Sequence, residues 1–306
     1  MCCLFGLLDY KHSLTQKQQR RIVSMLAVAA EDRGTDATGI AYNSHDRLHI
    51  YKRPLPAHGM KLSLPHGIIT VMGRTRMTTQ GDEKRNYNNH PFPGLDSTFA
   101  LAHNGVLYND ERLRKSEKLP DTRIETDSYI AVQLIEQSGL LSFDSLRPMA
   151  EKLEGSFTMT VLDKNDNLYF IRGDNPMCIY HYPDAGVYVY ASTEPILLEA
   201  ISKFSFRLGK KEKVDLKCGD ILMIDKHGRQ TRTEFDTINL MLCSYRYSFW
   251  HSVPPTPKVS LDREYIDDLK AVAGGLGYSP NYIDYLISGG YTGEEIEELM
   301  YYGGMF

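Results

Sequence analysis

Residues 1–8 read MCCLFGLL, so two cysteines directly follow the start methionine and an apolar run follows them. A short apolar run of this kind is typical of a buried β-strand. It is too short to cross a membrane, which takes about 20 apolar residues. It also lacks the basic start and the small-residue cleavage site of a signal peptide. The stretch therefore predicts a buried strand at the very beginning of the chain.

Cys2 gains a second property when the start methionine is trimmed, as is normal before a small residue. The thiol then lies beside a free α-amino group. Such amines titrate at about pH 8, so this one can take the thiol's proton near neutrality. Cys2 is therefore a candidate nucleophile. The competing interpretation is a small buried strand residue, since free cysteines are among the most buried residue types.

The composition is that of a globular protein with a substantial core. The chain has 306 residues, 42% of them hydrophobic, and a formal net charge of −4. This charge gives no electrostatic reason to expect a nucleic acid or an anionic membrane as partner. Five cysteines without paired spacing argue against a disulfide framework. We therefore expect a cytoplasmic protein with reduced thiols, no nucleic-acid partner and no membrane partner.

Residues 2–240 show the pattern of an α+β fold. We expect Ser13 to cap a helix over residues 14–34, and a helical pair is expected over 126–139 and 142–155. Strand patterns occupy residues 39–53, 67–77, 98–109, 156–173, 177–192 and 217–232. Strands with one helical pair in the middle indicate a layered arrangement.

The composition changes near residue 241. Pro254, Pro255 and Pro257 make residues 241–257 a predicted linker. Residues 258–306 hold nine acidic and three basic residues, and residues 277–286 match 290–299 at an offset of 13. This segment predicts a small acidic helical module. Its apolar faces are expected to comprise Tyr278, Tyr282, Ile283, Tyr285, Leu286, Ile296, Leu299 and Tyr301.

Six short motifs follow one another between residues 1 and 131. They are MCCLFG (1–6), DRGTDATGIA (32–41), GRTRMTTQG (73–81), NNHPF (88–92), LAHNG (101–105) and TDSYIA (126–131). Each is weak alone, but together they resemble the glutaminase domain of class II glutamine amidotransferases, a family of N-terminal-nucleophile hydrolases. The resemblance covers about residues 2–235. It implies a four-layer αββα sandwich, with two antiparallel sheets face to face and Cys2 at the end of an inner strand.

The resemblance also implies roles for individual residues. Cys2 matches the nucleophile, and the side-chain amide of Asn104 and the backbone N–H of Gly105 match the oxyanion hole. Arg76 matches the arginine that grips the α-carboxylate of glutamine, a bidentate pairing. Thr79 falls in the same substrate loop, which we define as residues 73–81. Asp127 matches the carboxylate that receives the α-ammonium group.

Arg33 and Asp36 match structural supports near the site. The resemblance requires no metal and no organic cofactor. Other interpretations stay open for some of these residues. Asn104-Gly105 is also a common hairpin turn, and Asp127 is also a common helix cap, although Thr126 can supply that cap. His90 and His103 lack metal-ligand spacing and are expected to be satisfied structural histidines.

The chain departs from the family pattern at four positions. Cys3 stands where the family usually has glycine, so its side chain is expected to fit beside the active centre. Arg74 replaces a histidine, Met77 a tryptophan and Gln80 a common histidine. The reacting residues are kept, while the substrate loop is altered.

Three functions follow as hypotheses. The first is a glutaminase that feeds ammonia to a separate ATP-dependent synthetase, alone or as a homo-oligomer. The second is a stand-alone amidohydrolase of a γ-glutamyl amide or another small amide. The third is an inactive adaptor that binds a partner through the acidic module. The intact set of Cys2, Arg76, Asn104 and Asp127 argues against the third.

Overall fold

The computed structural model describes residues 2–240, 263–275, 279–288, 293, 296 and 297. Internal contacts divide the chain into two compact units, Met1–Tyr247 and Ser248–Phe306. The predicted linker at 241–257 lies outside the described residues.

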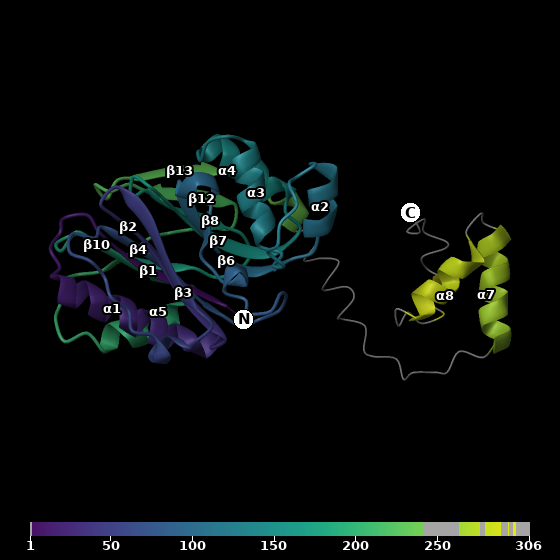
Figure 1. Ribbon diagram of the computed structural model, residues 1–306, viewed down its shortest axis with the longest axis horizontal. Helices are drawn as coiled ribbons and strands as arrows, with labels where there is room; N and C mark the ends of the chain where they lie inside the picture. The colour runs from purple at the N-terminus through teal and green to yellow at the C-terminus, as the bar shows by residue number, and fades with distance from the viewer. Residues whose placement is uncertain (1, 241–262, 276–278, 289–292, 294–295, 298–306) are drawn as a thin grey trace. The chain divides into compact units, whose positions relative to one another are not determined.

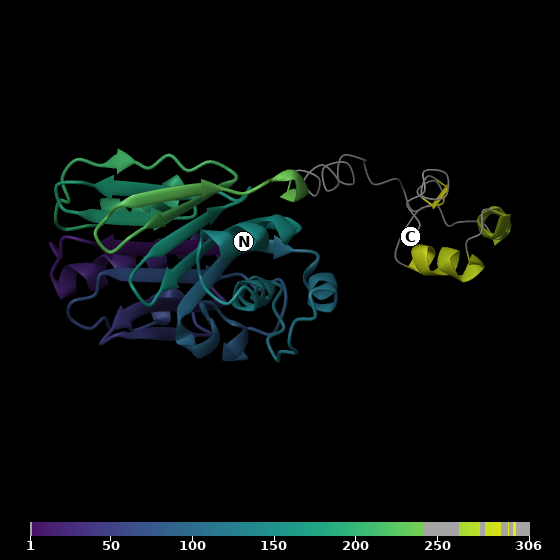
Figure 2. The same cartoon turned by 90° about the horizontal axis from the view of Figure 1, so that it is seen from above.

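Two antiparallel sheets form the centre of the first unit (Figures 1 and 2). The first contains β1 (Cys3–Asp9), β2 (Ala37–Ser44), β3 (Arg47–Arg53), β4 (Thr70–Arg76), β9 (Cys178–Tyr182), β10 (Val187–Ala191) and β11 (Glu212–Lys213). Its order is β11-β9-β10-β1-β4-β2-β3. The second contains β5 (Phe92–Pro93), β6 (Phe99–Leu107), β7 (Gly155–Asp163), β8 (Leu168–Arg172), β12 (Asp220–Ile224) and β13 (Gln230–Glu234). Its order is β13-β12-β8-β7-β6-β5.

Helices cover the outer face of each sheet (Figure 1). α1 (Gln16–Ala29) and α5 (Glu194–Ser202) pack on the first sheet, and their Leu26 and Leu197 are buried in the same apolar core as Phe5. α2 (Asp110–Ser116), α3 (Tyr129–Gln137) and α4 (Phe143–Lys152) pack on the second sheet. A third apolar core, which includes Leu4 and Phe170, lies between the sheets. The predicted αββα sandwich is therefore confirmed.

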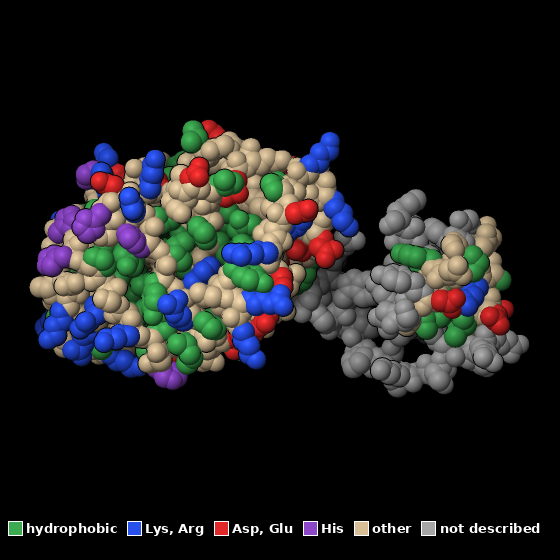
Figure 3. Space-filling model, viewed as in Figure 1, with side chains coloured by type: hydrophobic (Ala, Val, Ile, Leu, Met, Phe, Trp, Pro, Cys, Tyr) green, Lys and Arg blue, Asp and Glu red, His purple; other side chains and the backbone are tan. Residues whose placement is uncertain are grey.

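The described part of the first unit, residues 2–240, also contains four short 3-10 helices: η1 (Ala30–Arg33), η2 (Ala57–Gly59), η3 (Asn86–Asn88) and η4 (Leu95–Ser97). Lys and Arg side chains gather over the side of this unit that carries α1 (Figure 3), where Lys17, Arg20 and Arg21 are exposed. This basic surface belongs to the outer helical layer, and none of the residues with predicted catalytic roles lies in α1.

β1 lies in the middle of its sheet, between β10 and β4. Its odd-numbered residues join the core under the helices and its even-numbered residues join the core between the sheets, as the period of two in a strand requires. Met72 of β4 and Ala102 of β6 also face the inter-sheet core. Side chains of the same parity at these strand ends therefore project into the inter-sheet layer: Cys2, Arg74, Arg76 and Asn104.

Local signals at the helix starts differ from expectation. Thr15, not Ser13, caps α1, because Thr15 and Gln18 form a reciprocal capping box. The backbone and hydroxyl of Ser13 instead bind Asp9 of β1. The prediction at Ser13 is therefore wrong. Neither α2 nor α5 was predicted, although α2 has acidic residues in its first turn and basic residues in its last.

The second unit is helical, as predicted. α7 (Arg263–Gly275) and α8 (Pro280–Ser288) share a small core of Leu269, Ala273, Ile283, Leu286 and Ile296. Lys270 and Asp284 form an ion pair at 2.7 Å between the two helices. Tyr282, expected on an apolar face, is 37% exposed. Tyr278, Leu299, Tyr301 and the side chain of Tyr285 lie outside the described residues.

Among the described residues, no helix is both long enough and apolar enough to cross a membrane.

Candidate active site

Cys2 lies just before β1 and is buried, with 5% of its surface exposed. Its Sγ accepts a hydrogen bond from Arg74 Nη2 at 2.7 Å. The same sulfur lies 3.4 Å from both the backbone nitrogen and the carbonyl oxygen of Met77 in the substrate loop. Arg33 Nε donates to the Cys2 carbonyl oxygen at 2.9 Å. The residue is thus held at its backbone by one arginine and at its sulfur by another.

Cys3 points away from this site. It is fully buried in the core under α1 and α5, and its Sγ donates to the Leu4 carbonyl at 3.3 Å. Burial raises the pKa of the Cys3 thiol to about 11. The expectation that Cys3 fits beside the active centre is wrong, because neighbouring strand residues face opposite sides of a sheet.

Asn104 and Gly105 lie within β6 rather than in a hairpin turn. Asn104 Nδ2 is buried and has no hydrogen-bond partner in the described part of the chain. This leaves an amide donor available to an oxygen that enters the site. Gly105 has φ +145°, and a Cβ there would lie 1.8 Å from the Ser156 carbonyl oxygen, so no other residue fits.

Asn175, in the loop after β8, holds this end of β6. Its Nδ2 donates to the Asn104 carbonyl oxygen at 3.0 Å and to Ser156 Oγ at 2.8 Å. Its own carbonyl oxygen accepts from Thr158 Oγ1 at 2.6 Å and from Arg172. Asn175 therefore fixes the backbone that carries Asn104 and Gly105.

Arg76 is buried at the end of β4. Its Nη1 donates to Asn89 Oδ1 at 2.7 Å, and its Nη2 donates to the carbonyls of Gln80 and Gly81 at 2.5 and 3.1 Å. Burial, with the nearby Arg74 charge, lowers the pKa of Arg76 to about 10, so the guanidinium stays protonated at neutral pH. Thr79 lies in the same loop and is exposed.

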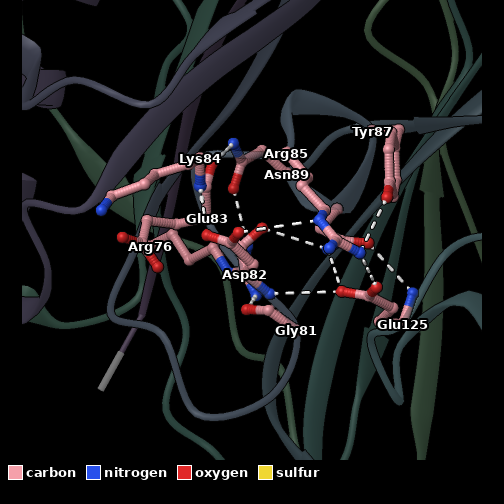
Figure 4. A network of polar contacts seen from close by, with 10 residues as sticks. Arg76, Gly81, Asp82, Glu83, Lys84, Arg85, Tyr87, Asn89 and Glu125 are labelled. Atoms are coloured by element: carbon pink, nitrogen blue, oxygen red, sulfur yellow. Dashed lines mark hydrogen bonds and ion pairs between the residues drawn. The ribbon is translucent and has the colours of Figure 1, made fainter.

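The segment after the substrate loop is held by a polar network (Figure 4). Asn89 Nδ2 donates to the Glu83 carbonyl at 2.7 Å, which links Arg76 to this segment. Glu125 forms an ion pair with Arg85 and accepts from Asn88 Nδ2 at 2.8 Å. Because Glu125 lies two positions before Asp127, this network ties the Arg76 segment to the Asp127 segment.

Asp127 is buried between β6 and α3. Its Oδ2 accepts from the Leu107 backbone at 2.6 Å, and its Oδ1 accepts from Ser128 Oγ at 3.1 Å. α3 begins at Tyr129 without a side-chain cap, and Thr126 Oγ1 has no partner among the described residues. The capping interpretation is therefore wrong for both residues. Each Asp127 oxygen keeps capacity for a further donor.

Asp36 connects β2 to the substrate loop. Its Oδ2 accepts from the Thr78 backbone at 2.7 Å, and its own backbone N–H donates to the Arg76 carbonyl at 3.0 Å. Together with the contact of Arg33 to Cys2, this places both predicted supports directly behind the thiol and the loop.

His90 and His103 are buried, and each has one ring nitrogen without a partner in the described chain. Ser128 gives its hydroxyl hydrogen to Asp127, so His103 Nδ1, at 2.7 Å from Ser128 Oγ, is the donor of that pair. Arg74 donates to His90 Nδ1. Burial lowers the pKa of His103 to about 4 and that of His90 well below its usual range, so both rings are neutral. The expectation of satisfied histidines holds at one nitrogen of each ring and fails at the other.

Sequence reasoning assigned no role to Arg74, Asn89 or Asn175, which the structure places in direct contact with the predicted site residues Cys2, Arg76 and Asn104. It also assigned none to Glu125, which contacts Arg85 and Asn88 in the segment after the substrate loop. Arg74 lies in the motif of the substrate loop, where it was noted only as a departure from the family pattern, and Asn89 lies in the motif NNHPF. Asn175 stands in a Gly-Asp-Asn-Pro sequence, which reads as a turn. The signal that could have identified Asn175 is a turn sequence that follows a strand of the sheet carrying the site.

The described residues contain no group of three or more His, Cys, Asp or Glu side chains placed to hold a metal ion. An open depression of about 520 Å³ lies on β12, β13 and α4. Its lining has mixed charge and includes none of the predicted site residues: Arg147, Asp215, Lys217, Asp220, Arg232, Thr233 and Glu234.

Comparison with known proteins gives a consistent result. Residues 75–199 match the family model described as a glutamine amidotransferase domain. The glutamine–fructose-6-phosphate aminotransferase (isomerizing) of Halalkalibacterium halodurans is 29% identical over 180 residues, 57% of this chain and 30% of that protein. The corresponding enzyme of Geobacillus kaustophilus is 27% identical over 233 residues, 73% of this chain and 36% of that protein. The chain thus spans roughly a third of the length of these relatives.

Among solved structures, the glutamine phosphoribosylpyrophosphate amidotransferase of B. subtilis, complexed with ADP and GMP, has a TM-score of 0.61 to this chain. The likeness covers 77% of this chain and 49% of that one, at 19% sequence identity. At this identity the match shows the fold, and the fold is that of the two-sheet sandwich described above.

Proposed function

We propose that the chain is a class II glutamine amidotransferase, and that it hydrolyses the side-chain amide of glutamine through Cys2 and releases glutamate and ammonia. One observation carries this proposal. The unpartnered amide donor of Asn104 and the thiol of Cys2 project into the same buried inter-sheet layer. A nucleophile and an unused donor in one buried layer suit attack on a carbonyl carbon.

The proposed reaction begins with the α-carboxylate of glutamine on Arg76 and its α-ammonium on Asp127. The α-amino group of Cys2 takes the thiol proton, and Sγ bonds to the amide carbon. Asn104 Nδ2 and the Gly105 N–H hold the resulting oxyanion. The protonated amine then gives its proton to the leaving nitrogen, the C–N bond breaks, and ammonia departs. Water hydrolyses the thioester with the same amine as base.

The N-terminus tests this proposal. Intact-mass analysis is expected to show loss of Met1, and an electrophilic glutamine analogue is expected to label Cys2. Arg76→Ala is expected to lower kcat/KM for glutamine at least tenfold, because it removes a charge-assisted pair with the α-carboxylate. A protein that keeps Met1 and still hydrolyses glutamine at full rate overturns the mechanism.

The fate of the ammonia is a further part of the proposal. The first hypothesis requires a separate ATP-dependent synthetase that uses the ammonia. This chain would supply it either as a single copy or as a homo-oligomer. The names of the similar proteins mention fructose 6-phosphate and phosphoribosylpyrophosphate beside glutamine. These compounds belong to the reactions of those proteins and are not assigned to this chain. We place the chain in the cytoplasm, because a catalytic thiol needs reducing conditions. We divide it into a catalytic domain at 2–240, a linker at 241–257 and a helical module at 258–306.

The altered substrate loop favours a second candidate. Arg74, Met77 and Gln80 differ from the family pattern, so a stand-alone amidohydrolase acting on a γ-glutamyl amide or another small amide is the alternative. Comparing kcat/KM for glutamine with that for γ-glutamyl amides separates the two. An inactive adaptor, the third hypothesis, predicts no turnover of any amide and no labelling of Cys2.

A further inference from the structure

Arg74 is the side chain that touches the sulfur of Cys2, and the reaction above gives it no part. We propose that Arg74 is a catalytic residue that stabilises the Cys2 thiolate as its counter-ion, so that the resting nucleophile is ionised without relying on the α-amine alone. The proposal rests on the proposed function only for the identity of the substrate. The state of the sulfur is tested without any substrate.

The contact geometry supports a charge-assisted bond. Arg74 Nη2 lies 2.7 Å from Cys2 Sγ, while Nη1 of the same guanidinium donates to His90 Nδ1. The planar fork of an arginine is suited to two such fixed directions, and its charge is permanent. His90 is neutral and has an acceptor at Nδ1, so it orients the guanidinium without cancelling its charge.

The burial of Arg74 requires a counter-ion. Arg74 is 5% exposed, and its Nε has no hydrogen-bond partner in the described chain. Its hydrogen-bond partners there are the Cys2 sulfur and His90, neither of which is a carboxylate. A buried cation is costly unless an anion or strong acceptors compensate it. A thiolate at 2.7 Å supplies that anion, and the thiol proton goes to the α-amine, which later gives it to the leaving nitrogen.

The wider surroundings hold charges of both signs. The charges of Arg74 and Lys52 act on neighbouring groups of the site, and Cys2 itself acts on Arg76. The titratable and charged groups around the sulfur and its arginine come from β1, η1, β3, β4, β6 and the loops beside them and after β8: Cys3, Arg33, Asp36, Lys52, Arg76, Glu83, His90, His103, Asp127 and Asp174. Both histidines are neutral and Cys3 is a protonated thiol, and Arg74 is the charged side chain that contacts the sulfur.

The test is the pH dependence of Cys2 alkylation in the full chain, without glutamine. Iodoacetamide reacts with thiolates, and tandem mass spectrometry of the N-terminal peptide distinguishes Cys2 from Cys3. A Cys218→Ser background removes an exposed thiol. We expect Arg74→Gln to move the midpoint upward by about one pH unit or more, which is about a tenfold slower reaction below the midpoint. Arg74→Lys keeps the charge and is expected to recover part of the shift.

Arg33→Gln is the matched control, because Arg33 donates to the backbone carbonyl oxygen of Cys2. It is expected to move the midpoint by less than half as much as Arg74→Gln. Thermal melting checks that each variant is folded. If Arg74→Gln is not folded, the midpoint of Arg74→Lys is compared with that of wild type instead. Equal midpoints in Arg74→Gln and wild type, or an equal shift in Arg33→Gln, overturn the proposal. A protein that fails to hydrolyse glutamine but shows the expected midpoints refutes the proposed substrate alone.

Discussion

At the residue scale, Cys2 and Cys3 are neighbours in the chain with opposite surroundings. We expect Cys2→Ala to abolish turnover and Cys3→Ala to keep kcat/KM within about twofold, because the Cys3 side chain lies in the core under α1. The loss of one buried sulfur from that core is expected to lower the free energy of unfolding by about 1 kcal/mol. Steady-state kinetics and urea unfolding check both expectations. Equal loss of activity in the two variants would reverse the assignment.

Asn104 gives a second prediction at this scale. Asn104→Ala removes the amide donor and is expected to lower kcat by about 10²- to 10³-fold with little change in KM, since the donor acts on charge that develops in the transition state. Asn175→Ala is the control, because it loosens the same backbone without removing the donor. It is expected to cost less in kcat than Asn104→Ala. A larger cost at Asn175, or a purely KM effect at Asn104, contradicts the oxyanion role.

At the element scale, the turn between β7 and β8 holds a carboxyl group in an unfavourable place. Asp166 has φ +63°, and burial raises its pKa to about 6, although Asn43 donates to it at 3.1 Å. A folded pKa above the unfolded value means that the group adds stability below about pH 4 and loses it as pH rises through about 6.

We therefore expect Asp166→Asn to raise the free energy of unfolding at pH 7 by about 1–2 kcal/mol, less than the full shift implies, since the side chain is partly exposed. The gain is expected to vanish near pH 4, as urea unfolding at both pH values will show. Asp46→Asn is the control, because Asp46 has φ +59° in an exposed turn and isolates the backbone effect. An equal gain at both pH values in Asp166→Asn would point to the backbone alone.

The segment after the substrate loop depends on Glu125. Glu125→Gln keeps the size of the side chain but loses the ion pair with Arg85 and weakens the acceptor for Asn88. We expect KM for glutamine to rise by up to about fivefold, the scale of an exposed ion pair, with kcat nearly unchanged. Glu117→Gln removes a comparable ion pair with Lys152 outside this network and is expected to leave KM unchanged. An unchanged KM in Glu125→Gln would show that the polar network does not contribute to substrate binding.

Strands and site residues were predicted with unequal success, for physical reasons. The apolar runs along residues 2–8, 67–77 and 98–109 are local, so they indicated β1, β4 and β6. The role of Asn175 is not local, because it depends on a loop that β7 and β8 bring beside β6. The contact between Arg74 and Cys2 likewise needs the pairing of two strands about 70 residues apart. Such contacts between distant residues cannot be predicted from the local spacing of residues in the sequence.

At the scale of the whole molecule, the two units are predicted to function separately. The first unit contains three apolar cores and every predicted site residue, while the second has a core of its own. Deletion of residues 248–306 is therefore expected to leave kcat/KM within about twofold of wild type and the melting temperature of the first unit unchanged. Kinetics and calorimetry of the shortened chain test this. Unfolding or loss of turnover would show that the second unit supports the first.

The central position of β1 sets an order of events during synthesis. Its partners are β4, around residue 73, and β10, around residue 189. The first strand therefore cannot pair on both sides until nearly two thirds of the chain has been synthesised. At about 5–20 residues per second, the ribosome needs about 10–40 s to reach that point. An aminopeptidase needs an exposed terminus, whereas Cys2 is buried once the sheet closes. The proposed removal of Met1 is therefore expected in the interval before β10 emerges, so that the chain would be processed chemically before its first sheet is complete.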